Sequence, residues 1–180
     1  MNDPALFPTL KTERLLLRQL LIEDDKTILF LRSNDAVNQY LDRPKTTTIN
    51  EAREFINKIN LGIQKGQSFY WAVSPLSNNE LIGTICLWNR SEDKLSIEIG
   101  FELHPDFQGK GFMQEALSAV IKFVFQILNI QSISADVHKD NKKSIKLLEK
   151  NRFQIDKQRE TENQDNMEFY NMTAYLLAKY

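Results

Sequence analysis

The sequence predicts an α/β fold, with a mixed sheet of about seven strands and helices between them. Short segments in which apolar and polar residues alternate indicate strands, and longer segments with apolar residues at helical spacing indicate helices. The predicted strands and helices alternate along the chain, without a sequence repeat or a linker. A length of 180 residues with 42% hydrophobic content suits one folded domain, residues 1–180, and excludes a disordered chain.

The chain is expected to begin with a strand followed by helices. Residues 14–20 are predicted as a strand, although their leucine run leaves the period ambiguous. Residues 23–32 are predicted as a helix because acidic residues occupy its first turn, where they favour the helix dipole. Another helix is expected at residues 49–65, with Asn50 as its N-cap and Gly66 as its C-terminal stop.

The next segments are predicted as a strand pair. Residues 68–74 and 80–89 are predicted as two strands, and residues 75–79 between them (Pro-Leu-Ser-Asn-Asn) are typical of a turn. The remaining elements expected are a strand at residues 95–103, a long helix after residue 111, a strand at 132–138, a short helix at 141–150, and strands near 153–159 and 167–177.

Residues 107–116 carry the most information about function. They read Phe-Gln-Gly-Lys-Gly-Phe-Met-Gln-Glu-Ala and lie between a predicted strand and a predicted helix. The first turn of a helix has unpaired N–H groups at the positive end of the helix dipole, and these attract phosphate. Gly109 and Gly111 allow close approach of a ligand or a positive φ, and Lys110 adds a cation. The plainer alternative is a tight loop with a glycine-assisted helix start.

The flanking segments favour the phosphate site. Apolar and polar residues alternate over residues 95–103, and Pro105 ends this strand because it has no N–H to donate. A Walker loop would need Ser or Thr after Gly-Lys, and the dinucleotide fingerprint would need glycine in place of Gln114, so neither motif fits. After the glycines, an apolar stripe at helical spacing is expected to pack on a sheet: Met113, Ala116, Leu117, Val120, Ile121, Val124 and Leu128.

The segment Gln108-Gly109-Lys110-Gly111-Phe112-Met113 resembles the pyrophosphate-binding turn of the GNAT acetyltransferases, which hold acetyl-coenzyme A. Other segments resemble the RimJ/RimL branch of this family, the ribosomal-protein N-acetyltransferases. Residues 12–18 (Thr-Glu-Arg-Leu-Leu-Leu-Arg) resemble its opening strand, and residues 81–85 and 97–101 resemble its third and fourth strands. Residues 141–153 resemble its Asn-x-x-Ser…Glu-Lys-x-Gly-Phe segment.

Two positions depart from the family pattern. Met113 stands where the pattern has a small residue, and its side chain can narrow the space beside the phosphate. Arg152 takes the place of the family glycine. The turn there is expected either to be strained or to use Asn151 as its left-handed residue.

The resemblance implies the GNAT fold, in which a central twisted mixed sheet carries helices on both faces and a parallel strand pair splays apart. It also implies an N-acetyltransferase with acetyl-CoA as donor, direct attack of an amine on the thioester, and no metal. The backbone of Phe101, Glu102 and Leu103 would pair with the pantetheine arm, and Asn141 would hydrogen-bond the same arm. The pyrophosphate would be held by Gln108, Gly109, Lys110, Gly111, Phe112 and Met113.

The resemblance assigns the acid role to Ser144, which would protonate the departing thiolate. Many relatives carry a tyrosine for this task seven residues after the asparagine, but that position is Leu148 here. A purely structural interpretation is also open, with Asn141 as an N-cap and Ser144 in the first turn of the helix.

Glu98 and Asp136 are the candidates for a general base. Glu98 projects opposite to the apolar row of its strand, and Asp136 lies where some relatives keep a catalytic glutamate. Both carboxylates have a plain alternative as solvated or ion-paired groups. His104 and His138 flank strand ends and are expected to be surface or hydrogen-bonding residues.

The acceptor is expected to be a primary amine, above all the N-terminal α-amine of a protein such as a ribosomal protein. An α-amine with a pKa near 8 is roughly a tenth neutral at pH 7, so a water relay can deprotonate it. Alternatives are a small amine (a polyamine, an antibiotic or an amino acid) and a non-catalytic acyl-CoA-binding module. The acceptor loops, residues 38–48 and 160–166, carry no readable code, although acidic residues in and after the second one can attract a cation.

Composition limits the partners and the location. A formal net charge of −1 gives no basic surface for direct nucleic-acid binding. The single Cys86 excludes an internal disulfide and suits a reducing cytoplasm. Residues 116–130 are interrupted by Lys122 and Gln126, so no membrane contact is expected, and no N-terminal signal segment is evident. A cytoplasmic monomer or homodimer is therefore expected.

Overall fold

The computed structural model describes residues 7–159 and 171–179. The chain falls into two compact units, one of Met1–Trp88 with Gly100–Ala119 and one of Asn89–Ile99 with Val120–Tyr180. The single domain expected for residues 1–180 stays a prediction.

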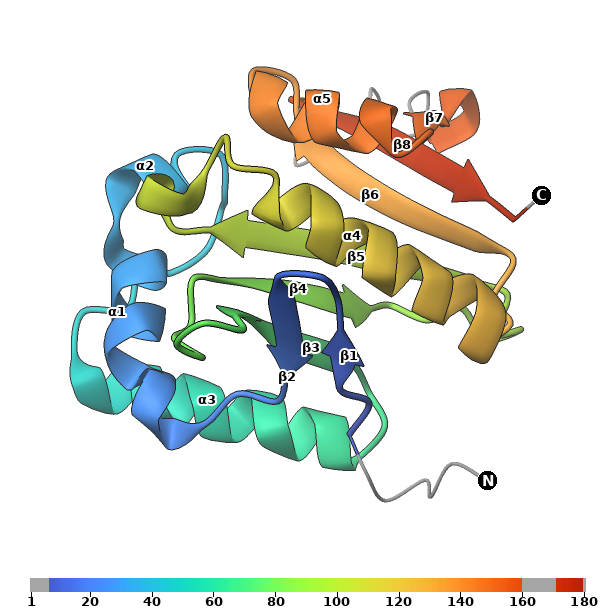
Figure 1. The fold of residues 1–180 in the computed structure, drawn as a ribbon. Helices are drawn as coiled ribbons and strands as arrows, with labels where there is room; N and C mark the ends of the chain where they lie inside the picture. The colour runs from blue at the N-terminus through green and yellow to red at the C-terminus, as the bar shows by residue number, and fades with distance from the viewer. Residues whose placement is uncertain (1–6, 160–170, 180) are drawn as a thin grey trace. The chain divides into compact units, whose positions relative to one another are not determined.

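The strands form a mixed eight-stranded sheet, in agreement with the predicted α/β class and with one strand beyond the expected number (Figure 1). The first unit has the order β1-β2-β3-β4-β5, and the second has β5-β6-β8-β7, because β5 contributes residues to both. The strands are β1 (Leu10–Lys11), β2 (Leu15–Arg18), β3 (Phe69–Pro75), β4 (Gly83–Trp88), β5 (Ser96–Leu103), β6 (Ser132–His138), β7 (Gln154–Ile155) and β8 (Met172–Ala178).

The helices include short 3₁₀ and π segments as well as α-helices. They are η1 (Ile22–Asp24), α1 (Asp25–Ser33), α2 (Asp35–Asn38), α3 (Ile49–Gln64), η2 (Pro105–Phe107), α4 (Phe112–Lys122), η3 (Phe123–Ile127) and α5 (Lys142–Lys150). The predicted helix at residues 23–32 therefore corresponds to the end of η1 and most of α1.

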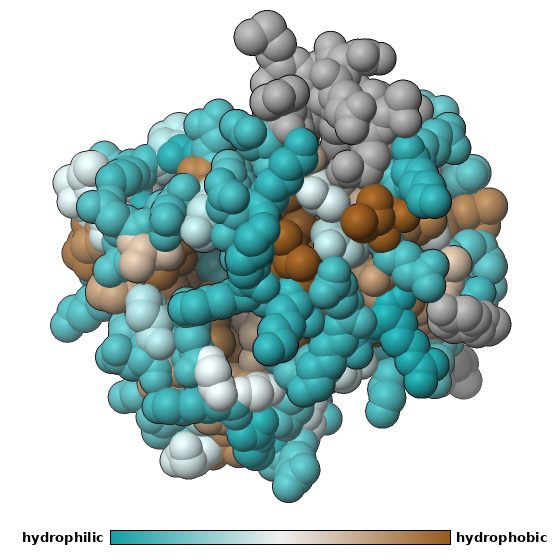
Figure 2. Space-filling model, turned by 90° about the horizontal axis from the view of Figure 1, so that it is seen from above, coloured by the Kyte–Doolittle hydropathy of each residue, from teal (hydrophilic) through white to brown (hydrophobic). Residues whose placement is uncertain are grey.

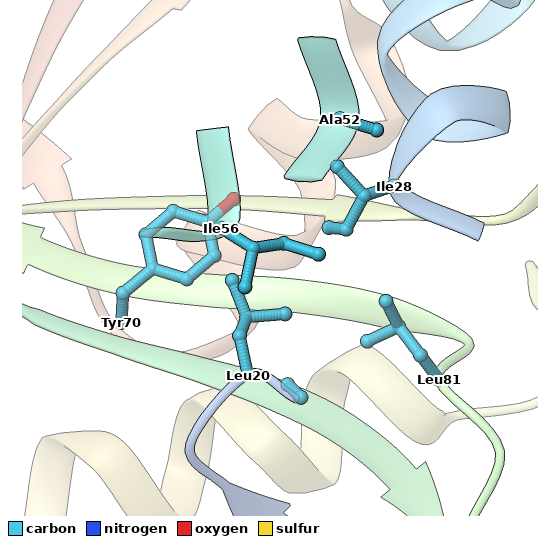
Figure 3. Close-up of a cluster of buried hydrophobic side chains, with 7 residues drawn as sticks. Leu20, Ile28, Ala52, Ile56, Tyr70 and Leu81 are labelled. Carbon is cyan, nitrogen blue, oxygen red and sulfur yellow. The ribbon is translucent and has the colours of Figure 1, made fainter. Parts of the chain in front are cut away.

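The core of the first unit lies between α1, α3 and one face of β3. Its cluster of buried side chains comprises Leu20, Ile28, Ala52, Ile56, Tyr70, Ala72 and Leu81 (Figure 3). Residues 70–75 of β3 are all buried, so both faces of this strand are covered. A strand covered on both faces needs apolar residues at successive positions, which is why residues 68–74 alternate only weakly.

The N-cap of α3 differs from the prediction. Thr48, and not Asn50, is the N-cap, and its hydroxyl accepts a hydrogen bond from the Glu51 N–H at 3.2 Å. The carboxylate of Glu51 reaches back to the Thr47 N–H at 2.6 Å. This arrangement resembles a capping box, whose Thr-x-x-Glu signature was available in the sequence. Gly66 has φ +68° just after the C-cap, so its predicted role as the stop is confirmed.

The long helix after the glycines changes geometry part way along. α4 ends at Lys122 and continues into the π-helical η3, in which the Leu128 N–H donates to the Phe123 carbonyl at 3.1 Å. The wider π turn alters the phase of the apolar stripe. Phe123 and Val124 are buried, whereas Ile127 is 59% exposed.

In the second unit, β5 and β6 form the expected parallel pair. Their ladder joins residues 96–98 with residues 132–134 and ends there, while β6 continues along the antiparallel β8 over residues 132–138. The pairing of β5 with β6 is thus much shorter than either strand, as a splayed pair requires.

The turn after α5 places Arg152 itself in the left-handed conformation, with φ +66°, whereas Asn151 has φ −92°. The use of Asn151 as the left-handed residue is therefore wrong. The Arg152 N–H donates to Glu149 and the Phe153 N–H donates to Leu148, at 2.9 and 3.1 Å. These bonds form a Schellman motif with arginine at the position that favours glycine, which costs about 1 kcal/mol of backbone strain.

Candidate functional site

The turn at residues 108–113 has the geometry of an anion site. Gly109 and Gly111 have φ +76° and φ +79°, values that L side chains adopt only with strain. α4 begins directly afterwards, at Phe112. Among the described residues, the N–H groups of residues 109–113 have no hydrogen-bond partner. A run of unpaired N–H groups at a helix start is suited to binding a phosphate or pyrophosphate.

Met113 does not obstruct this turn. Met113 is 7% exposed, and Ala116 and Leu117 of the same helix face are also buried. Gly109, Lys110 and Gly111, in contrast, are exposed. The methionine side chain therefore packs in the interior while its N–H stays in the first turn of α4, so the departure from the family pattern leaves the exposed side of the turn open.

Gln108 connects the turn to the end of β5. Its side-chain Nε2 donates to the Leu103 carbonyl at 3.1 Å. Phe101, Glu102 and Leu103, the residues predicted to pair with pantetheine, are all half-buried. The Glu102 carboxylate accepts hydrogen bonds from Arg43 at 2.5 Å and from Thr84 at 3.2 Å. The side chain of Glu102 is thus held by contacts within the protein.

The two histidines have structural contacts of the same kind. Nδ1 of His104 accepts from the Asp106 N–H, and Nδ1 of His138 accepts from the Asp140 N–H, both at 3.2 Å. His104 also stacks on Phe30, with ring centroids 4.2 Å apart. Both side chains therefore act as hydrogen-bonding residues that stabilise turns.

Glu98 and Asp136 lie on the same face of the second unit's sheet. Glu98 pairs with Ser134 across the ladder, and Asp136 is two residues further along β6. Burial raises the pKa of Glu98, a hydrogen bond from Asn89 at 3.0 Å opposes this rise, and the charge of Asp136 adds to it. A carboxylate with a raised pKa is a stronger proton acceptor than an ordinary one.

Asp136 is held in an ion pair. Its Oδ2 lies 2.6 Å from Nη2 of Arg159, and its side chain is 10% exposed. Its Oδ1 is buried without a hydrogen-bond partner in the part of the chain that the structure describes. The ion-paired alternative is therefore observed for Asp136, and Glu98 is the less constrained of the two carboxylates.

Asn141 and Ser144 meet at the start of α5. The side-chain oxygen of Asn141 accepts from the Ser144 N–H at 3.1 Å, which makes Asn141 the N-cap. Only the backbone of Ser144 takes part in this cap. Within residues 7–159 and 171–179, neither the Asn141 amide nitrogen nor the Ser144 hydroxyl has a hydrogen-bond partner. Both groups remain available to a ligand.

Arg14 is a residue beside the turn to which the sequence assigned no role. Its guanidinium donates to the Lys110 carbonyl at 3.1 Å and to the Glu115 carboxylate at 2.7 Å. Arg14 lies in the segment at residues 12–18, but it contacts residues about a hundred positions later in the chain. No pattern of neighbouring residues could therefore predict this contact.

The expected acceptor loops are described only in part. Arg43, in the loop at residues 38–48, forms the ion pair with Glu102 of β5. The loop at residues 160–166 and the acidic residues Glu160, Glu162, Asp165 and Glu168 lie outside the described residues. The first unit also has a cleft of about 580 Å³ bordered by Arg18, Asp24, His104 and Phe107, and none of the predicted coenzyme residues lines it.

The described residues include neither a membrane-spanning helix nor a cluster of metal-ligating side chains. Most of the face seen in Figure 2 is hydrophilic, with hydrophobic residues in small separate patches. None of the helices that the structure describes combines the length and apolar content needed to cross a bilayer. Nor do the described residues bring three or more His, Cys, Asp or Glu side chains together as a metal site would require.

Comparison with known proteins identifies the family. Residues 14–154 match the family model of the acetyltransferase (GNAT) domain. The chain is 34% identical over 149 residues to the uncharacterized N-acetyltransferase YoaA of Bacillus subtilis (strain 168), covering 83% of this chain and 84% of that protein. It is 26% identical over 147 residues to the ribosomal protein uS5-alanine N-acetyltransferase of Escherichia coli (strain K12), covering 77% and 74%.

A solved structure agrees with the family at the level of the fold. RimL, the ribosomal L7/L12 alpha-N-protein acetyltransferase in complex with coenzyme A, matches with a TM-score of 0.79 at 21% identity, covering 95% of this chain and 98% of that one. The family model covers most of the chain and YoaA exceeds 30% identity, so the relationship does not depend on the fold alone. The chain belongs to the GNAT family of N-acetyltransferases.

Proposed function

We propose that the protein transfers the acetyl group of acetyl-CoA to a primary amine, the N-terminal α-amine of a protein such as a ribosomal protein. The binding of acetyl-CoA is supported above all by the unpaired backbone N–H groups of residues 109–113. This segment contains two glycines in the left-handed conformation, Gly109 and Gly111. The acceptor part is supported by relatives named for acetylation of ribosomal proteins uS5 and L7/L12.

In the proposed reaction the amine nitrogen attacks the thioester carbonyl carbon directly. The C–S bond breaks as the N–C bond forms, the thiolate receives a proton from Ser144, which regains one from water, and the amine gives up a proton to Glu98, directly or through water. The raised pKa of Glu98 suits this role. Asp136 is the other candidate base, and its ion pair with Arg159 argues against it.

The pantetheine arm would be held by the backbone of Phe101, Glu102 and Leu103 and by the side-chain amide of Asn141. Two observations support this assignment. The Asn141 oxygen is occupied by the N-cap bond, so the amide N–H groups are left to donate to a carbonyl of the arm. Phe101, Glu102 and Leu103 are half-buried residues at the end of β5, where a ligand can pair with the backbone.

Gly111→Asp is expected to weaken acetyl-CoA binding more than tenfold, or about 1.4 kcal/mol. The substitution forces a side chain onto a residue with φ +79°, and its Cβ would lie 3.3 Å from Nη2 of Arg14, so the turn must shift and the N–H groups that would hold the pyrophosphate move with it. Isothermal titration of the purified variant measures the effect. Gly66→Asp is a matched control because Gly66 also has a positive φ, +68°, but lies at the end of α3. Unchanged coenzyme affinity in a folded Gly111→Asp variant would contradict the site.

Acceptor identity is tested with pairs of peptides. Peptides copying the N-termini of ribosomal proteins uS5 and L7/L12 are incubated with the enzyme and acetyl-CoA, each beside a version whose α-amine is formylated. Mass spectrometry should show a gain of one acetyl group only on the free α-amine. Acetylation restricted to polyamines, aminoglycosides or amino acids would overturn the protein acceptor, and coenzyme binding without transfer to any amine would overturn catalysis.

A further inference from the structure

Arg14 precedes β2 and packs against the glycine turn from one side. Its Nη1 donates to the Lys110 carbonyl at 3.1 Å, and its guanidinium lies 4.7 Å from the centroid of the Phe112 ring. A Cβ added to Gly111 would lie 3.3 Å from Nη2 of Arg14. The side chain therefore contacts Lys110 and Phe112 and lies beside Gly111 between them, and all of these residues belong to the first unit.

Glu115 fixes the position of Arg14. Its Oε2 accepts from Nε of Arg14 at 2.7 Å, while its Oε1 accepts from the Arg14 N–H at 2.8 Å and from the Thr12 hydroxyl at 2.6 Å. Burial would raise the pKa of Glu115, but the hydrogen bonds from Thr12 and Arg14 lower it, so the group is a carboxylate at neutral pH. The Glu115 N–H bonds to the Gly111 carbonyl at 3.1 Å, so this anchor is part of the first turn of α4.

The contact with the Lys110 carbonyl decides which way one peptide group faces. In a trans peptide the C=O and the N–H point in opposite directions. A carbonyl of Lys110 that points to Arg14 therefore directs the Gly111 N–H away from Arg14. Rotation of this peptide changes φ of Gly111, and glycine adopts either sign of φ at little cost, so the turn by itself does not prevent the rotation.

We propose that Arg14 is a positioning residue for the coenzyme site, which holds the Lys110–Gly111 peptide so that the Gly111 N–H faces the pyrophosphate. The inference rests on the proposed acetyl-CoA site. Arg14 needs no contact with the ligand, because its charge is already met by Glu115. Without Arg14 the peptide populates both orientations, and the apparent affinity falls by the fraction of molecules that are competent to bind.

The test compares Arg14→Ala with Thr12→Val. Thr12→Val removes a hydrogen bond to Glu115 but leaves the contact between Arg14 and Lys110 in place. Arg14→Ala is expected to raise the dissociation constants of CoA and of 3′-dephospho-CoA by the same factor, about twofold for two equally populated peptide orientations, because both ligands keep the pyrophosphate. KM for acetyl-CoA should rise in parallel while kcat stays within twofold. Thr12→Val should lower the melting temperature and leave both dissociation constants unchanged.

The possible results separate the two proposals. A wild-type protein that fails to bind CoA would overturn the proposed function. A wild-type protein that binds CoA, together with a folded Arg14→Ala variant of equal affinity, would overturn only the positioning role. A loss confined to CoA, with 3′-dephospho-CoA unaffected, would also overturn that role, because it would mean direct contact with the 3′-phosphate. An equal loss of CoA affinity in Thr12→Val would also contradict the positioning role, because Arg14 would then act only through the general stability of the turn.

Discussion

Glu98→Gln is expected to lower kcat by roughly 100- to 10,000-fold, the range over which general bases contribute. The glutamine keeps the shape of the side chain and an oxygen that can accept from Asn89, so the loss would report proton transfer. Wild-type kcat should fall as the pH drops through the raised pKa of Glu98. The variant should lack this acidic limb, which a pH–rate profile from pH 5 to 9 would reveal.

Stability provides the control for this experiment. Burial raises the pKa of Glu98 above that of the unfolded chain, so its favourable contribution to folding is present at low pH and is lost as the pH rises through the folded value. At pH 7 the neutral glutamine should therefore melt at or above the wild-type temperature. Asp136→Asn should instead lower the melting temperature, because it breaks the ion pair with Arg159. Full activity in Glu98→Gln would remove Glu98 from the mechanism.

Ser144→Ala is expected to lower kcat by roughly 10- to 100-fold, while KM for acetyl-CoA stays within a few-fold. A thiol with a pKa near 8.5 is a moderately good leaving group, so its protonation contributes less than that of an alkoxide would. The N-cap bond at the start of α5 comes from the Ser144 backbone N–H, which alanine retains. The melting temperature should thus change little, and stopped assays with purified enzyme measure both parameters.

Asn141→Ala is the companion variant for Ser144. It removes the N-cap of α5 and should cost about 1 kcal/mol of stability. If Ser144→Ala shows wild-type kcat, the hydroxyl has no part in proton transfer and the serine is only a helix residue. The two variants together therefore distinguish a chemical role at Ser144 from a structural role of the helix start.

Most of the fold follows from periodicity, and the exceptions have physical causes. β6 occupies the predicted residues, because its alternating pattern matches one buried face. β1 has two residues, too few to show a period. The phase change at η3 depends on a bulge in the helix, which a pattern assuming 3.6 residues per turn does not include.

The geometry of the candidate site was predictable where it depends on residues close together in the sequence. The turn at residues 108–113 combines two glycines with the start of a helix, and adjacent residues of the sequence predict both features. The ion pair between Arg14 and Glu115 joins residues 101 positions apart, so only the folded chain brings them together. The choice between Glu98 and Asp136 needed the partners of each carboxylate, Asn89 and Arg159, which sequence spacing does not reveal.

One strand carries both the candidate base and the predicted pantetheine-binding backbone. Glu98 and Phe101 are three residues apart within the continuous strand β5. A rise of about 3.3 Å per residue separates their Cα atoms by about 10 Å. Bond lengths and extended dihedral angles set this spacing. Substitutions in the surrounding loops therefore leave the distance between these two residues of β5 unchanged. Evolution of a new acceptor preference could therefore reshape those loops without altering the spacing between the candidate base and the predicted pantetheine-binding residues.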